Sequence, residues 1–221
     1  MSEGFADLRR CRLPRGRHGL PREIVTSSQR ERLLAAVVRV SAEKGYEATT
    51  VGDILAVAGV GRESFYELFD DKLACMRTAH ALLVEDLEAQ VRAAYEVPGP
   101  WVDRVSAGLA AALGWFAADP AAGRFVMVEM SRVGPGARER LLAVFTRFTA
   151  LLDAGFAATP DLPRAARLAL GGTVTRVYEA VVSDRTAELP GQLPELTFEL
   201  LVPFVGEETA RAERGRLAAG R

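Results

Sequence analysis

Apolar residues recur at helical spacing through most of this chain, and no segment alternates apolar and polar positions as a half-buried strand does. Proline and glycine separate the periodic segments. The pattern predicts an all-α fold, with helices at about 28–44, 51–58 and 61–67 and a long helix that is capped by Asp70 or Asp71 and runs to about Tyr95. Further helices are predicted at 101–118, 121–131, 135–157, 162–184 and 194–205, with a polar tail from Glu207.

Capping signals mark the ends of the first helices. Ser28 and Glu31 form a capping-box pattern ahead of the first apolar face. Thr50 is a suitable N-cap for the second helix, whose third position holds Asp53, and Gly59 ends that helix. Two short helices that are joined by a tight turn and followed by a long helix are typical of a helix-turn-helix, which reads DNA in the major groove.

The length and composition allow one domain or two. The chain has 221 residues, of which 49% are hydrophobic, so it can bury a sizeable core. We expect a basic, flexible N-terminal arm at residues 1–25 and a three-helix DNA-binding domain at 26–74. The remainder, 75–221, is expected to form a larger helical domain for ligand binding, regulation and dimerisation.

Charge points to nucleic acid only at the N-terminus. The net charge of the chain is −1, but six arginines and no acid lie between Arg9 and Arg22. One interpretation is a solvated, disordered tail. The other is an arm that lies along DNA or in a narrow minor groove, with Arg15 and Arg17 as contacts.

The chain lacks the side-chain groupings that most enzymes need. Its two histidines, His18 and His80, are far apart, and Cys11 and Cys75 have no metal-binding or redox spacing. We find no phosphate-binding glycine loop and no nucleophile elbow, so we expect no enzymatic activity, no metal and no cofactor. No signal peptide or apolar run of about 20 residues is present, which predicts a cytoplasmic protein that does not cross a membrane.

Residues 32–75 carry a more specific signal, RLLAAVVRVSAEKGYEATTVGDILAVAGVGRESFYELFDDKLAC. The informative features are Gly45-Tyr46, Thr49-Thr50-Val51, Asp53-Ile54, Ala58-Gly59-Val60, Phe65-Tyr66-x-x-Phe69 and Asp71-Lys72. Their joint spacing resembles the tetracycline-repressor (TetR) family of bacterial transcriptional regulators. The similarity covers a fifth of the chain. Gly61 departs from it, because we expect serine or threonine as the cap there.

The recognition helix supplies the candidate base contacts. Arg62, Glu63 and Ser64 lie on its first turn, where side chains reach base edges. Arg62 can pair with guanine or bind a phosphate, and Glu63 can accept from a cytosine amino group. The alternative for each is a solvated surface position. Phe65 and Phe69 are expected to fill the core beneath the helix.

Three further residues are candidate phosphate contacts. Thr50 is either a helix cap only or also a donor to a phosphate at that helix N-terminus. The resemblance implies that Tyr66 donates to a phosphate, whereas the alternative is core packing. A cation at Lys72, in the first turn of a helix, is unfavourable unless an anion is near. The resemblance implies that this anion is a DNA phosphate.

Large apolar side chains in the C-terminal region have two interpretations. They form an ordinary helical core, or they line an apolar pocket. The resemblance implies a pocket that holds a small lipophilic inducer, and the candidate lining residues are Trp101, Trp115, Phe116, Phe125, Met127, Phe145 and Phe148. Polar groups that could orient the inducer are Arg124, Glu129, Arg176, Tyr178 and Glu179.

Dimerisation follows from both the pattern and the resemblance. One recognition helix reads too few base pairs, so a two-fold dimer on a palindromic operator is expected. The resemblance places the dimer interface on helices 162–184 and 194–205, although these helices could instead close the core of the monomer. We therefore expect a dimeric repressor that a small apolar ligand releases from its operator. The alternative is a DNA-binding regulator whose C-terminal domain only dimerises or binds a protein partner.

Overall fold

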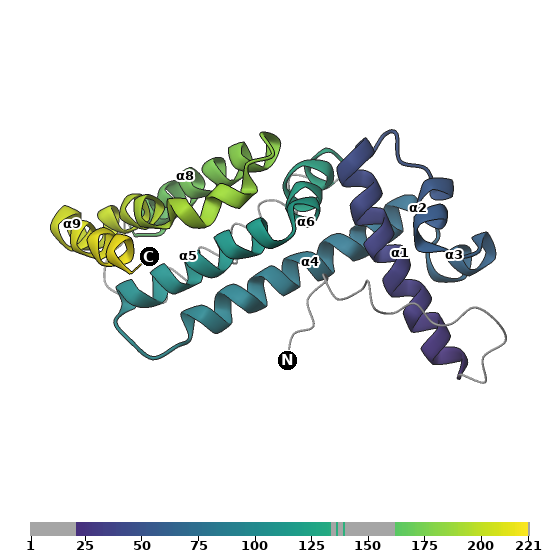
Figure 1. Ribbon diagram of the computed structural model, residues 1–221, viewed down its shortest axis with the longest axis horizontal. Coiled ribbons are helices and arrows are strands. Elements are labelled where there is room, and N and C mark those ends of the chain that lie inside the picture. The colour runs from purple at the N-terminus through teal and green to yellow at the C-terminus, as the bar shows by residue number, and fades with distance from the viewer. Residues whose placement is uncertain (1–20, 134–135, 137–138, 140–161, 221) are drawn as a thin grey trace. The chain divides into compact units, whose positions relative to one another are not determined.

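The computed structural model describes residues 21–133, 136, 139 and 162–220, and every regular element in these ranges is helical. In chain order the elements are α1 (Arg22–Lys44), α2 (Val51–Ala58), α3 (Arg62–Leu68), α4 (Lys72–Tyr95), α5 (Trp101–Ala118), α6 (Pro120–Arg124), the π-helix η2 (Phe125–Glu129), the 3-10 helix η3 (Met130–Arg132), α8 (Leu162–Val182), the 3-10 helix η4 (Thr186–Gln192) and α9 (Leu193–Ala219) (Figure 1). The predicted all-α fold, with an N-terminal helix-turn-helix and a larger helical part, is confirmed.

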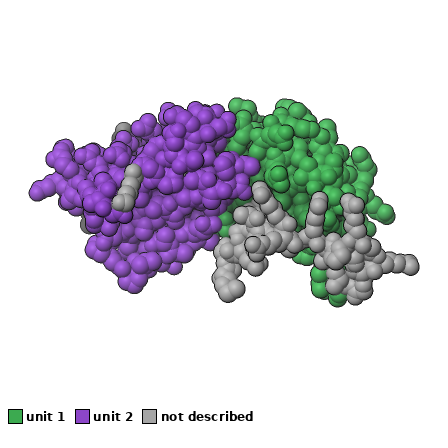
Figure 2. Space-filling view, in the orientation of Figure 1, with its two compact units in different colours: residues 1–86, 124–135 green, residues 87–123, 136–221 purple. Residues whose placement is uncertain are grey.

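The chain divides into two compact units, which are coloured separately in Figure 2. Unit 1 comprises Met1–Asp86 and Arg124–Pro135, and unit 2 comprises Leu87–Gly123 and Gly136–Arg221. The segment that carries η2 and η3 therefore belongs with the N-terminal helices. The two units are defined by contacts between residues. The boundary expected after residue 74, between the DNA-binding and the regulatory domain, stays a prediction.

The core of unit 1 forms where the apolar pattern predicted it. Leu33 and Val37 of α1 are fully buried, as is Ile54 of α2. Phe65 of α3 is 0% exposed and Phe69 is 6% exposed, so the two rings anchor the recognition helix from below. Their centroids are 5.8 Å apart in a tilted arrangement. A seven-residue helix is too short to be stable alone, and this packing stabilises it.

The start of α1 differs from the prediction. The helix begins at Arg22 and not near residue 28, because Pro21 directly precedes it with φ −52°, and proline suits a helix start better than a helix interior. Ser28 is buried inside the helix, and it is Ser27 whose hydroxyl donates to Glu31 Oε1, at 3.2 Å. The capping box expected at Ser28 was therefore wrong.

Two C-terminal expectations also change. The predicted helix 121–131 is instead a short α6 followed by one π-helical and one 3-10 segment. The expected polar tail from Glu207 is helical, and α9 kinks at Gly206, where φ is +79°. Beyond the kink Ala210 and Glu213 are buried, and the Ser106 hydroxyl of α5 donates to Glu213 Oε1 at 2.6 Å. The predicted helix 135–157 lies almost entirely outside the described residues.

Unit 2 packs α5 against α9 and η4. Leu113 is fully buried, and the ring of Phe116 lies so close to Gly123 that a Cβ there would be 2.9 Å from Phe116 Cδ1. Glycine at position 123 thus permits this contact. Within the described ranges no helix is long and apolar enough to span a bilayer.

Candidate DNA-binding surface

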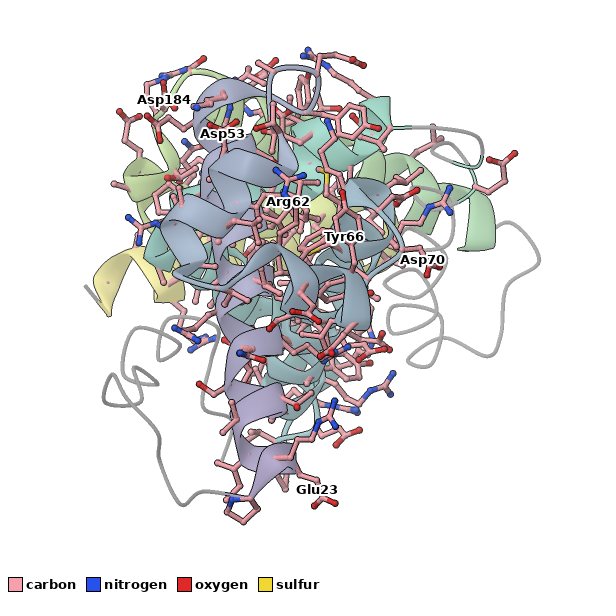
Figure 3. All side chains as sticks on the ribbon, turned by 90° about the vertical axis from the view of Figure 1, so that its right-hand side faces the viewer. Glu23, Asp53, Arg62, Tyr66, Asp70 and Asp184 are labelled. Atoms are coloured by element: carbon pink, nitrogen blue, oxygen red, sulfur yellow. The ribbon has the colours of Figure 1, made fainter. Side chains whose placement is uncertain are left out.

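The outward face of α3 carries the predicted base contacts. Arg62, Glu63 and Tyr66 are exposed, Tyr66 to 50%, and Ser64 is half-buried. Figure 3 looks onto this side of the molecule, with Arg62 and Tyr66 labelled near its centre. The rings of the buried Phe65 and of Tyr66 form a T-shaped pair with their centroids 5.3 Å apart, so the exposed ring has a packed support.

Two glycines flank the turn before α3, and only one is required by the backbone. Gly59 has φ +63°, a left-handed conformation that strains other residues. Gly61 has an ordinary φ of −72°, and a Cβ there would meet nothing within 4 Å. The departure at Gly61 is therefore not explained by sterics. Arg32 of α1 was not predicted from the sequence as part of this surface. Its Nη1 lies 3.5 Å from the Gly59 carbonyl oxygen, at the C-terminus of α2.

The N-terminus of α2 is held by a complete capping box. The Asp53 N–H donates to Thr50 Oγ1 at 3.1 Å, and the Thr50 N–H donates to Asp53 Oδ2 at 3.0 Å. Lys44 Nζ lies 2.7 Å from Asp53 Oδ1. Thr50 is exposed, and its hydroxyl also donates to Asp53 Oδ2 at 2.7 Å, so a phosphate contact would have to take over one of these donors. The predicted cap is confirmed, and Lys44 is a supporting residue that the sequence analysis did not find.

Acid should weaken this cap. The hydrogen bond from Lys44, and then those from the Thr50 side chain and backbone, lower the pKa of Asp53 from 3.8 to about 2. Because the folded pKa lies below the unfolded one, the cap contributes its full stability above about pH 4 and loses it as the pH falls towards 2. We expect hydrogen-exchange protection of the first turn of α2 to fall over this range. The variant Asp53→Asn should lack that dependence, and an equal dependence in both proteins would contradict the assignment.

The turn between α1 and α2 is clamped by Lys72. Its Nζ donates to the carbonyl oxygens of Tyr46 at 2.8 Å and Thr49 at 2.7 Å, and lies 4.0 Å from the centroid of the Tyr46 ring. An ammonium has three donors around one point and can bind two converging carbonyls, which a planar guanidinium fits poorly. The sequence contains 26 arginines and only two lysines, Lys44 and Lys72, and both lysines hold this turn.

Glu129 of η2 contacts the same turn from a distant part of the sequence. Its Oε2 accepts a hydrogen bond from the Tyr46 N–H at 2.8 Å, and its Oε1 lies 3.9 Å from Arg124 Nε. The Glu129 side chain is only 3% exposed. From the sequence, Glu129 was expected only as a group that could orient a ligand, because nothing local indicates a partner 83 residues away.

The candidate ligand residues are only partly described. Phe125 is fully buried in unit 1. Trp115 and Phe116 are buried in unit 2, where the rings of Trp101 and Phe204 form a tilted pair with centroids 5.5 Å apart. Met127 is half-buried in η2. Phe145 and Phe148 lie outside the described residues. A cavity of about 390 Å³ in unit 2 is lined instead by residues such as Val97, Asp103, Ser106 and Arg216, with none of the candidates.

Other chemistry is sparse in the described part of the chain. No group of three histidine, cysteine or acidic side chains there could hold a metal ion. Burial raises the pKa of the Cys75 thiol to about 12, so this cysteine is not a nucleophile at neutral pH. Cys11, Arg15 and Arg17 lie outside the described residues.

An exposed recognition helix on a buried aromatic base, beside a capped helix N-terminus, defines a helix-turn-helix DNA-binding protein. Residues 33–79 match the family model described as "Bacterial regulatory proteins, tetR family". This match runs from α1 to the start of α4, so it covers about a fifth of the chain, the part that holds the helix-turn-helix. No curated protein sequence matches it significantly.

Solved structures share the fold. The fatty acid degradation regulator FadR from Bacillus halodurans is 18% identical, with a TM-score of 0.71 over 80% of this chain and 97% of that one. FadR from Bacillus subtilis in complex with stearoyl-CoA is also 18% identical, with a TM-score of 0.67 over 76% and 96%. A TetR-family regulator from Syntrophomonas wolfei is 20% identical, with a TM-score of 0.62 over 80% and 95%. At these identities the similarity concerns the fold.

Proposed function

We propose that this protein is a homodimeric repressor that binds a palindromic operator and is released from it by a small lipophilic ligand. The observation that carries the proposal is the outer face of α3, where Arg62, Glu63 and Tyr66 are exposed above a buried aromatic base. Arg62, Glu63 and Ser64 read base edges. Thr50, Tyr66 and Lys72 contact phosphates.

Charge on this surface gives the N-terminal arm a role. From Arg62 to Asp71 there is one arginine against the four acids Glu63, Glu67, Asp70 and Asp71. Affinity for DNA depends largely on cations that neutralise phosphates. The arginines of the arm, Arg15 and Arg17 among them, form a cluster without acids that can supply this charge.

Selection of an operator sequence from random DNA tests this function directly. Full-length protein should select an inverted repeat from a pool of random duplexes, with half-sites whose centres are about one helical turn or a multiple apart. Recovery of no common sequence after repeated rounds would contradict sequence-specific binding. Recovery of a single half-site would contradict the two-fold dimer.

An apolar stripe on α8 supports the dimer. Leu168 is 70% exposed, and Tyr178 and Val182 are 38% and 40% exposed. Gly172 and Thr175 lie between them on the exposed side of the helix. Exposed apolar side chains that are aligned on one helix are typical of a protein interface. With α9, this stripe is the proposed contact between the two copies.

A charge on the stripe should separate the copies. We expect the double variant Leu168→Glu, Val182→Glu to be monomeric by light scattering and to bind the selected operator at least about 100-fold more weakly, because it cannot engage two half-sites together. Val97→Glu is the matched control, since Val97 is 58% exposed in unit 2 but lies off α8. A double variant that stays dimeric would overturn this interface.

The effector class is argued from side chains and from one structural relative. Trp115 and Phe116 of unit 2 are large, apolar and buried, and FadR from Bacillus subtilis, which shares the fold, was solved with stearoyl-CoA. Stearoyl-CoA, stearate and free coenzyme A are therefore suitable first probes. A probe that raises the melting temperature and also weakens operator binding supports release by a ligand. Absence of both effects over a wide range of lipophilic compounds would favour a C-terminal domain that only dimerises or binds a protein.

A further inference from the structure

The turn at residues 45–50 is stabilised by side chains from several helices. Gly45 has φ +80°, and its carbonyl oxygen accepts from the Thr49 hydroxyl at 2.8 Å. Lys72 donates to the carbonyl oxygens of Tyr46 and Thr49, and Glu129 accepts from the Tyr46 N–H. The turn ends at Thr50, the cap of α2 and a proposed phosphate contact.

Glu129 is unusual among these partners. A carboxylate that is 3% exposed is costly to bury unless it is hydrogen-bonded, and the bond that it makes is to a backbone N–H of the turn. Its Oε2 also lies within 3.7 Å of the position that a Cβ on Gly45 would take, so the oxygen lies against the start of the turn.

The helix that carries Glu129 is irregular. Phe125–Glu129 is a π-helix between the α-helical Pro120–Arg124 and the 3-10 helix Met130–Arg132. A π-helical turn is rare and is frequently found at functional sites. Phe125 and Val128 of this segment are buried, which fixes the backbone from which Glu129 projects.

We propose that Glu129 is a positioning residue for DNA binding. Its carboxylate holds the Tyr46 N–H, and this contact sets the position of the turn and therefore of the Thr50 cap at the N-terminus of α2. Lys72 holds the carbonyl side of the turn and Glu129 holds the amide side, so loss of either partner leaves the turn held on one side only. The inference rests on the proposed operator binding for its functional consequence, but not for the contact itself.

Three substitutions separate the parts of this role. Glu129→Gln keeps an oxygen that can accept from the Tyr46 N–H, so it should retain most of the protection and affinity. Glu129→Asp keeps the charge but withdraws it by one methylene. Glu129→Ala removes the acceptor. We expect the hydrogen exchange of the Tyr46 amide to accelerate by about ten-fold or more in the alanine variant, less in the aspartate variant and least in the glutamine variant.

Operator affinity should follow the same order, with a loss of about ten-fold or more in Glu129→Ala for the duplex recovered by selection. Glu213→Ala is the control, because Glu213 is another buried, hydrogen-bonded carboxylate, in unit 2. It should lower thermal stability without accelerating exchange of the Tyr46 amide.

Exchange of the Tyr46 amide tests the contact, and operator affinity tests its role in DNA binding, so either result can be negative without the other. If the wild-type protein selects no DNA, the proposed function is wrong, while exchange at Tyr46 still decides the contact. If Glu129→Ala leaves both the exchange of the Tyr46 amide and the operator affinity at wild-type values, the proposed role is overturned. Should the alanine variant not fold, Glu129→Asp decides, and wild-type exchange and affinity in that variant would also overturn it.

Discussion

Replacing Arg62 with alanine is expected to weaken binding to the selected operator by about thirty-fold or more. Arg62 is exposed on the first turn of α3, where a guanidinium can pair bidentately with a guanine. Such a pair contributes about 1–3 kcal/mol, and a two-fold dimer loses it in both half-sites. Fluorescence anisotropy with labelled duplex at a fixed salt concentration measures the change.

Arg62→Lys distinguishes a base contact from a phosphate contact. Lysine keeps the charge but cannot form the two parallel hydrogen bonds, so a base contact predicts lower affinity and relaxed preference at one operator position. A phosphate contact predicts nearly wild-type binding. Arg185→Ala is the control, because it removes the same charge from an exposed ion pair in unit 2. Equal effects of Arg62→Ala and Arg185→Ala would contradict a specific role for Arg62.

The elements that the sequence predicted well are those with local end signals. The observed bounds of α2 and α5 match the predicted 51–58 and 101–118 residue for residue. Thr50 and Gly59 delimit the first of these helices, and Pro100 precedes the second. Caps and breakers act within a few residues of a helix end, so a single sequence contains the information needed to place them.

The elements that the sequence missed depend on distant partners. The π-helical register of Phe125–Glu129 brings Glu129 to a turn 83 residues earlier in the chain, and no local pattern specifies that contact. The second half of α9 was mistaken for a tail because its composition is polar. Ala210 and Glu213 are buried there, and the bond between Glu213 and Ser106 bridges 107 residues. Periodicity identifies an apolar face but not a buried carboxylate.

For Lys72, the sequence indicated a negatively charged partner but did not indicate that the protein's own backbone supplies one. Its rarity and its unfavourable place in the first turn of α4 indicated a nearby anionic partner. The structure shows partners inside the protein, the partly negative carbonyl oxygens of Tyr46 and Thr49. Two of the three ammonium donors are thereby used, and the Tyr46 ring lies 4.0 Å from Nζ, so at most one donor serves the proposed phosphate contact.

Replacing Lys72 with methionine should therefore destabilise unit 1 even without DNA. Methionine retains an apolar stem beside the Tyr46 ring but leaves two partly buried carbonyl oxygens without their donor. We expect the free energy of unfolding, measured from hydrogen exchange of α2 amides, to fall by about 1.5–3 kcal/mol. Lys44→Met is the control, since its pair with Asp53 is partly exposed and should contribute less. Wild-type stability of Lys72→Met would contradict the clamp.

The salt dependence of operator binding then tests the remaining donor of Lys72. Each phosphate contact that is lost reduces the slope of log K against log salt by about 0.9. If Lys72 clamps the turn and also binds a phosphate, the methionine variant loses stability, affinity and slope together. If the clamp is its whole role, stability and affinity fall while the slope stays at the wild-type value. Because the clamp orients Thr50 at the N-terminus of α2, affinity falls in both cases, and only the slope separates a residue that touches DNA from one that shapes the surface for it.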